Sequence, residues 1–491
     1  DELKEKELTE KEKRDAYLEA CEGLEEILHE EVDNLKTELV SRRELERIRK
    51  LNQRGFLDRM RSNEALAGTL ATLEVQVGWR YLINYLEEIE AVTPEAIRRV
   101  TRKYIRTENR TTVYVLPGGK PDSPPEQYAE LRSLTGSAAA QVVKTETSEN
   151  NSIYPTPEGW KHPLSFERKP ERIEYPKAET SNVEGAKVFY LPDRELPLID
   201  LTLLVRAGAV DVAEDKIGLP TLVNGALIRG GTEGYSPGEM AMVLDENAIQ
   251  LSVSVGEEDT VIRLSVTKSD WKKGLELLEE LLNRPRFDAG VLQVAKQEAL
   301  IDLKRQADNA RIVAAREGSI WFFKGHPYGR DPLLGLDTIA DITREDLVEF
   351  LKKYFVPSNM VAAVSGDIAK ADVEKGLHEL FRKLPNTMAP ERRLEDPART
   401  PPVLTLIHKP GQIQSQIMLR LPSVKRTHSE YWKISLLMDI FGGSDSLLYT
   451  RLRDDLGIAY AAWFYKTYKW RAGMLVGYMG CKAISTSRAI E

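Results

Sequence analysis

The sequence predicts an α+β protein made of tandem homologous domains, each a mixed and mostly antiparallel sheet with helices packed on it. Two observations lead to this fold class. Short runs in which apolar residues alternate at period two are interspersed with longer runs at helical spacing. One such helix-and-strand pattern also occurs twice in the chain. At 491 residues the chain has room for about three to four domains.

An internal repeat gives the domain organisation. Residues 92–105 match residues 342–355 without a gap, at a constant offset of 250 (354 − 104), and the register continues through Asn109 and Asn359. In each copy a Thr precedes the helix, an acidic residue lies in its first turn, and an apolar run follows. These runs, expected to be strands, are residues 112–116 and 361–364. A tandem duplication explains the match.

The first part of the chain is expected to be helical. Residues 1 to about 40 are rich in charge and predict a helix with one apolar face, and a second helix runs from about Arg43 through Met60. The apolar face consists of Leu24, Ile27, Leu28 and Val32. Residues 118–172, rich in Pro, Gly, Ser and Thr, predict a linker whose one element is a short helix at 127–134.

The central part alternates strands and helices. Residues 188–191 and 198–205 predict a hairpin around Pro192-Asp193-Arg194, and residues 251–255 and 261–266 predict a second strand pair. The amphipathic helix 271–282 follows. After a second linker at 387–402, rich in Pro and charge, the remaining expected elements are strands at 403–407 and 416–421 and a helix at 430–441.

Composition excludes several classes of protein. No apolar run approaches eighteen residues, so no membrane span is expected. The formal charge is −8 and basic residues are distributed, which argues against a nucleic-acid binder. Two cysteines, Cys21 and Cys481, are too few for a disulfide framework. The sequence does not indicate a cellular location.

Residues 218–232 have the frame of a zinc-peptidase helix without its ligands. In the motif His-x-x-Glu-His, two imidazoles on one helical face hold zinc and the Glu acts as general base. Here those positions are Thr221, Asn224 and Gly225. A catalytic zinc needs about three protein ligands and an open position, and the six histidines are scattered. The segment therefore predicts a core helix that holds no metal.

The residues around this segment resemble the M16 (pitrilysin/insulinase) metallopeptidases. The resemblance rests on Gly218-Leu219 before the motif, on Gly231-Thr232 after it, and on the segments 325–330 and 364–367. Members of that family take their third zinc ligand, a Glu, from a later helix. The matching position here is Asp302, which lies 77 residues beyond Gly225 (302 − 225).

The M16 resemblance implies a domain plan. Such enzymes contain four homologous domains arranged as two halves that close into a chamber, and one half is commonly inactive. By that template, residues 1–117 are the closing part of a companion domain, residues 173–386 a complete domain with a degenerate zinc motif, and residues 403–491 the start of a second companion domain. We therefore expect the sequence to be a fragment of a longer protein.

The same resemblance implies a function. The chain is expected to be a catalytically inactive half that shapes a peptide-binding chamber, binds polypeptide and supports a zinc-bearing partner or upstream domain, which would hold the zinc. Two alternatives stay open. The chain could be the C-terminal portion of an active zinc metalloendopeptidase whose catalytic domain precedes Asp1, or a structural core-type subunit with no proteolytic role.

Three further residues carry expectations. In active relatives an Arg and a Tyr seven positions apart reach toward the bound peptide, and Arg453 and Tyr460 match that spacing. Their alternative roles are an Arg in a surface ion pair and a Tyr packed in a strand. His326 is expected to position its own loop rather than to bind metal, because Pro327 and Gly329 indicate a turn.

Overall fold

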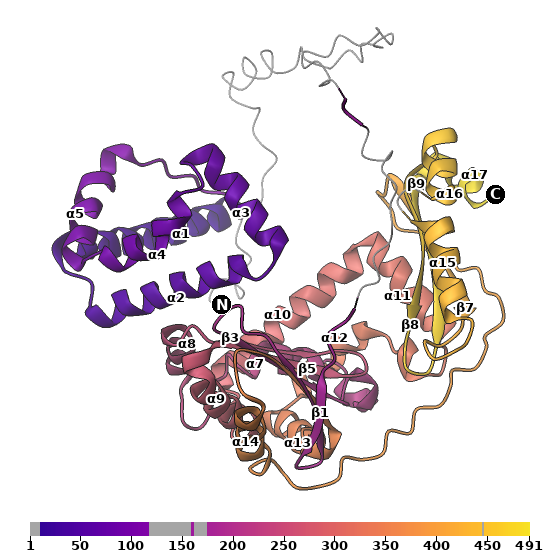
Figure 1. The fold of residues 1–491 in the computed structure, drawn as a ribbon. Coiled ribbons are helices and arrows are strands. Elements are labelled where there is room, and N and C mark those ends of the chain that lie inside the picture. The colour runs from indigo at the N-terminus through magenta and orange to yellow at the C-terminus, as the bar shows by residue number, and fades with distance from the viewer. Residues whose placement is uncertain (1–9, 117–158, 162–173, 444–445) are drawn as a thin grey trace. The chain divides into compact units, whose positions relative to one another are not determined.

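The computed structural model describes residues 10–116, 159–161, 174–443 and 446–491 (Figure 1). Its contacts divide the chain into two compact units, Asp1–Leu45 with Tyr85–Pro176 and Glu46–Asn84 with Lys177–Glu491. The helix expected at 127–134 lies outside the described residues, as does most of the linker 118–172. The domain boundaries inferred from the M16 template therefore stay predictions.

The first unit is helical. Helix α1 (Glu10–Thr37) confirms the predicted N-terminal helix, and α5 (Pro94–Tyr104) packs against it. The apolar face of α1 is largely exposed, since Leu24, Ile27 and Leu28 each keep at least 60% of their surface accessible. The boundary between the units falls inside α2 (Arg42–Met60) and α4 (Tyr81–Ala91), and α3 (Asn63–Gln76) belongs to the second unit.

The internal repeat is confirmed in its helix and turn. Helix α13 (Arg344–Tyr354) begins and ends 250 residues after α5, and a single 3₁₀ turn follows each helix. These turns are Thr107–Asn109 and Pro357–Asn359. The side chains of Thr93 and Thr343 cap the helices by accepting the amide of the third helical residue.

The strand expected after the first copy is wrong, although the second copy has it as β6 (Met360–Gly366). Residues 112–116 form no strand, and Tyr114 and Thr112 donate hydrogen bonds to Glu25 of α1. Hydrogen bonds from Tyr114 and then His29 lower the pKa of Glu25 to about 2. The same apolar pattern thus becomes a strand only where neighbouring strands supply a ladder.

The second unit contains a six-stranded sheet with the order β1-β2-β6-β3-β5-β4. Its strands are β1 (Glu179–Val183), β2 (Ala186–Pro192), β3 (Leu198–Val205), β4 (Gln250–Val255), β5 (Thr260–Thr267) and β6. Alternate residues of β3 and β5 are buried in the main core, among them Leu201 and Leu264. The residues between them, such as Thr202 and Arg263, therefore point to the opposite face of the sheet.

The hairpin expected between residues 188–191 and 198–205 is wrong. Strand β6 lies between β2 and β3, parallel to the first and antiparallel to the second. The hairpin partner of β2 is β1, through the two-residue turn Glu184-Gly185 in which both φ angles are positive. The sequence pattern located both strands but could not reveal that β6, which begins 155 residues after the end of β3 (360 − 205), would separate them. The pair β4–β5 is confirmed as antiparallel.

Helices pack on the apolar face of this sheet. Predicted helix 271–282 is confirmed as α9 (Trp271–Asn283), which buries Leu277, Leu278 and Leu281. The other helices of this region are α7 (Leu219–Ala226), α8 (Pro237–Glu246), α10 (Ala289–Asp308), α11 (Ala310–Phe322), α12 (Gly335–Thr338), α13 and α14 (Lys370–Phe381). In the described part of the chain no helix is long and apolar enough to cross a membrane.

A second, three-stranded sheet has the order β7-β9-β8 (Figure 1). It contains β7 (Gln414–Ser423), β8 (Ala459–Tyr468) and β9 (Gly473–Lys482), with α15 (Tyr431–Gly442), α16 (Leu447–Tyr449), a π-helix at Thr450–Asp455, and α17 (Thr486–Ile490). The strand at 416–421 and the helix at 430–441 are confirmed. The strand at 403–407 is wrong, because these residues pair with no strand and Leu404 and Leu406 are 91% exposed.

Candidate functional site

Helix α7 holds the degenerate motif. Gly218 precedes it with φ 99°, and a Cβ at that position would lie 2.4 Å from Cγ1 of Ile339, so only glycine fits. The helix buries Leu222, Val223 and Ala226. Thr221 and Asn224 therefore lie on its exposed side.

The second element of the motif packs directly against the first. A Cβ on Gly225 of α7 would lie 3.2 Å from Cβ of Ala295 on α10, so glycine allows the close approach of the two helices. Asp302 lies about two turns beyond Ala295 on α10 and is exposed. Thr221, Gly225 and Asp302 thus lie on two helices that contact each other.

These side chains do not fit a zinc ion. Thr221 offers a neutral hydroxyl, Gly225 offers no donor, and Asp302 is a single carboxylate, whereas zinc takes thiolate, imidazole or carboxylate ligands in sets of three or four. Across the described residues no group of three or more His, Cys, Asp or Glu is arranged to hold a metal ion. No hydrolytic step through a metal can be assigned to this helix.

Asn224 has a different role from the catalytic Glu whose position it takes. Its Oδ1 accepts the backbone N–H of Val255 at 2.7 Å, and its Nδ2 donates to the carbonyl of Val255 at 3.2 Å. The side-chain amide thereby binds both backbone groups of the last residue of β4, as another strand would. Helix α7 is tied to the edge of the sheet by this pair of hydrogen bonds.

Strand β4 is an edge strand of the described sheet, paired on one side with β5. Along an antiparallel edge, every second residue directs both its N–H and its C=O outward. Because Asn224 binds both groups of Val255, the outward residues of β4 are Val255, Val253 and Leu251. The edge therefore offers two further pairs of backbone groups next to the one that Asn224 occupies.

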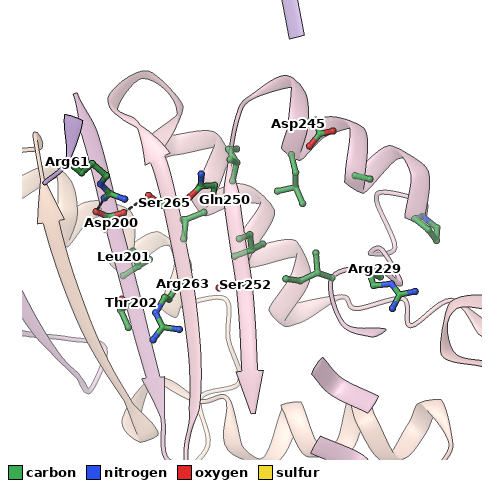
Figure 2. A pocket seen from close by; sticks show the side chains of 17 residues that line it. Arg61, Asp200, Leu201, Thr202, Arg229, Asp245, Gln250, Ser252, Arg263 and Ser265 are labelled. Carbon is green, nitrogen blue, oxygen red and sulfur yellow. Dashed lines mark hydrogen bonds and ion pairs between the residues drawn. The ribbon is translucent and has the colours of Figure 1, made fainter. Parts of the chain in front are cut away.

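A hollow of about 710 Å³ lies at this edge, between the polar face of the sheet and α8 (Figure 2). Five charged side chains line it, and four of them are paired. The pairs are Arg61 with Asp200, Arg229 with Glu298 at 2.8 Å, and Asp245 with Arg47 at 3.3 Å. The hydrogen bond to Glu298 raises the pKa of Arg229 and lowers that of the carboxylate. The fifth charge is Arg263, which has no ion-pair partner among the described residues.

Comparison with known proteins identifies this arrangement. Residues 341–491 match the family model of the peptidase M16 inactive domain. The crystal structure of the peptidase M16 inactive domain from Pseudomonas fluorescens superimposes with a TM-score of 0.60 at 25% identity, covering 64% of this chain and 76% of that one. Residues 341–491 therefore match the M16 inactive domain, and the fold of the chain is similar to that of an M16 inactive domain. A protease from Helicobacter pylori shares the M16-type fold, with a TM-score of 0.54 at 19% identity over 64% of this chain and 79% of that one.

The curated relatives are named either as a non-peptidase homolog or as uncharacterized zinc proteases. The chain is 24% identical over 311 residues to the non-peptidase homolog YmxG of Helicobacter pylori, a match that covers 63% of this chain and 71% of that protein. It is 25% identical over 260 residues to the uncharacterized zinc protease YmxG of Bacillus subtilis, covering 52% of this chain and 61% of the relative. The chain thus spans about two thirds of the length of these relatives.

Arg453 and Tyr460, the two residues expected to bind substrate, belong to the C-terminal part of the chain and do not line the hollow. Arg453 belongs to the π-helix, and its guanidinium stacks over the ring of Tyr449 at 4.9 Å. Tyr460 lies in β8 with 79% of its surface exposed. Among the described residues Arg453 has no ion pair, and Tyr460 is exposed on its strand; the roles of both residues stay predictions.

His326 positions its own loop, as expected. Its Nδ1 accepts the backbone N–H of Tyr328 at 3.1 Å, and its Nε2 contacts the carbonyl of Glu395 at 3.0 Å. Both ring nitrogens are thereby occupied by backbone groups.

The sequence analysis did not single out the polar face of β3, β4 and β5. Its signal was present in the alternation of β5, where Leu264 faces the core and its neighbours Arg263 and Ser265 must face away. An Arg in the middle of a strand is by itself an ordinary outward residue. Only the sheet order brings it together with Thr202 and Ser252 from two other strands.

Proposed function

We propose that this chain is a catalytically silent M16 half that binds extended polypeptide and presents it to a zinc-bearing M16 partner or paired domain, with which it encloses a chamber. One observation carries the proposal. The motif helix α7 is kept beside the edge strand β4, but Asn224 in place of the catalytic Glu secures β4 through Val255. The scaffold for holding peptide is retained, and the groups for hydrolysis are replaced.

Extended polypeptide is the ligand class that this edge suits best. An added strand would form main-chain hydrogen bonds with the outward backbone groups of Leu251 and Val253, and these bonds do not depend on the peptide's sequence. The hollow beside them would add contacts with the peptide's side chains. Asn224 limits the added strand at one end, because it already occupies the backbone groups of Val255.

The first test uses the purified chain and a labelled extended peptide. We expect binding by fluorescence anisotropy, no cleavage on prolonged incubation, and less than stoichiometric zinc by metal analysis. Val253→Pro removes one outward N–H at an edge position where proline is tolerated, so it should weaken binding at least tenfold. Val253→Ala, which keeps the N–H, is the matched control and should bind nearly as the parent does.

Two results would reject this function. Cleavage by the purified chain with one tightly held zinc, abolished by Asp302→Ala, would mean that the chain is itself a metallopeptidase. Absence of peptide binding, with a normally folded protein, would favour the alternative of a structural subunit without a proteolytic role.

The second test concerns the approach to a catalytic partner. We propose that Arg453 and Tyr460 reach peptide in the assembled peptidase, since both side chains are exposed and an Arg or a Tyr hydroxyl can donate to a peptide carbonyl. Arg453→Ala and Tyr460→Phe should each lower turnover several-fold when co-expressed with the zinc-bearing subunit, without changing the amount of complex recovered by gel filtration. Unchanged turnover would remove both residues from the binding site.

A further inference from the structure

Three polar side chains form one row across neighbouring strands in the hollow (Figure 2). Thr202 of β3 pairs in register with Arg263 of β5, and Arg263 pairs with Ser252 of β4. Residues directly opposite each other in an antiparallel sheet project from the same face, with Cβ atoms about 5 Å apart. Two residues with hydroxyl groups therefore lie on either side of Arg263 on the polar face of the sheet.

The neighbouring row on the same face is already satisfied. Asp200, Ser265 and Gln250 are opposite one another there. Residues of α2 and the turn after it bind all three: Arg54 donates to Ser265 at 2.6 Å, Gln250 donates to Asp58 at 3.0 Å, and Arg61 pairs with Asp200. The next row on the other side consists of Leu204, Val261 and Ser254 and contains no charged residue.

Arg263 is thus the cation in this hollow whose charge is not balanced by the described residues. The hollow's two aspartates, Asp200 and Asp245, are each paired with another arginine. Arg263 is exposed, whereas Arg54 of the adjacent row is only 2% exposed. A guanidinium with several free donors and a hydroxyl on either side has the donor set of a carboxylate-binding site.

We infer that Thr202, Arg263 and Ser252 form a subsite for the carboxylate of an Asp or Glu side chain on polypeptide bound along β4. The inference rests on the proposed function, since the peptide must lie on this edge. It adds a specificity: the bound segment carries an acidic residue on the side that faces the polar face of the sheet.

The geometry of an added strand supports this subsite. Such a strand would lie one interstrand spacing beyond β4, which places it two spacings, or about 10 Å, from β5. An arginine and a glutamate together span that separation, and Ser252 lies between them. Side chains alternate along the added strand, so the residue opposite Ser252 points toward Arg263, while its neighbours point toward the side of Leu251 and Val253.

The experiment uses two acetylated and amidated decapeptides with a Lys at each end and alternating Val and Thr between them. In one peptide a central Thr is replaced by Glu, and in its twin by Gln. We expect the full chain to bind the Glu peptide about tenfold more tightly than the Gln peptide by fluorescence anisotropy, because hydrogen bonds to a charged group are worth at least that factor. The preference should shrink as salt is raised from about 0.05 to 0.5 M.

Variants of the chain test which side chains cause the tighter binding of the Glu peptide. Arg263→Gln should abolish the difference in affinity between the two peptides, and the double variant Thr202→Val with Ser252→Ala should reduce it. Arg382→Gln, an exposed arginine just after α14, is the matched control and should keep it. A Glu in place of a central Val should bring no gain, because that side chain lies on the other face of the added strand.

The outcomes separate this subsite from the binding function itself. If neither peptide binds, the edge-binding function is rejected. If both bind equally well and Arg263→Gln changes nothing, the subsite is rejected and edge binding stands. A Gln peptide with a free C-terminus that binds as tightly as the amidated Glu peptide would show that Arg263 takes a terminal carboxylate instead, which would overturn the side-chain specificity.

Discussion

Asn224 shows how one residue can convert a catalytic position into a structural one. A Glu there would have a carboxylate that accepts hydrogen bonds but cannot donate to the carbonyl of Val255. The amide of Asn224 does both, at 2.7 and 3.2 Å. An amide at this position therefore supplies a donor that a carboxylate lacks, and it cannot act as a general base.

A stability and exchange measurement tests this role of Asn224. Asn224→Ala should lower the free energy of unfolding by about 1–2 kcal/mol, because two hydrogen bonds to the backbone of Val255 are lost at a partly exposed site. The amide of Val255 should exchange with deuterium at least tenfold faster. Thr221→Ala, on the exposed side of the same helix, is the control. Equal exchange at Val255 in the parent and in Asn224→Ala would contradict the assignment.

At the scale of secondary-structure elements, local patterns predicted the helices and the strands joined by short turns, but not the pairing of segments distant in sequence. Helices α9, α13 and α15 and the strand pair β4–β5 follow from periodicity, caps and short turns. All of these depend on residues close together in the sequence.

The failures all involve partners distant in sequence. Strand β6 separates β2 from β3, and its sequence copy at 112–116 contacts α1 through Glu25 and pairs with no strand in the described part of the chain. Residues 403–407 are an apolar run typical of a strand, yet no described strand pairs with them. Strand formation depends on the neighbouring strand as much as on the segment's own pattern.

For the candidate site, the sequence located the helices but not the group of strand residues. The degenerate motif located α7, and its spacing to Asp302 correctly indicated that α7 and α10 are neighbours. The row of Thr202, Arg263 and Ser252 could not be found from the sequence, because it depends on the order and register of three strands. Each residue alone is an ordinary outward side chain.

At the scale of the whole second unit, a polar joint connects the six-stranded sheet region with the three-stranded sheet. The β8–β9 turn contacts the loop after β4: the backbone N–H of Trp470 donates to Glu258 at 3.0 Å, and that of Arg471 donates to the hydroxyl of Tyr328 at 3.2 Å. Tyr328 in turn donates to Glu258. Burial, and then this hydrogen bond, raises the pKa of Tyr328, so its hydroxyl remains a donor near neutral pH.

The segment predicted as a linker at 387–402 takes part in this joint. Leu394 is only 5% exposed and packs in a cluster with Phe323, Tyr328 and Met474. Arg392 donates from Nε to Oδ1 of Asp211 at 2.8 Å, and the Asp211 side chain is only 8% exposed. A segment without helix or strand is thereby fixed to both sheet regions.

The contact of Arg392 with Asp211 predicts how the second unit unfolds on heating. Arg392→Ala leaves the nearly buried Asp211 carboxylate without its guanidinium partner, which should cost about 3 kcal/mol. Because the loss falls on the joint, the three-stranded sheet should unfold before the six-stranded sheet, and calorimetry should resolve an added transition at lower temperature. Arg393→Ala changes an exposed neighbour and should stay within about 0.5 kcal/mol of the parent. If Arg392→Ala melts as the parent does, with the same number of transitions, the two sheets are joined by their apolar cluster alone and Arg392 does not couple them.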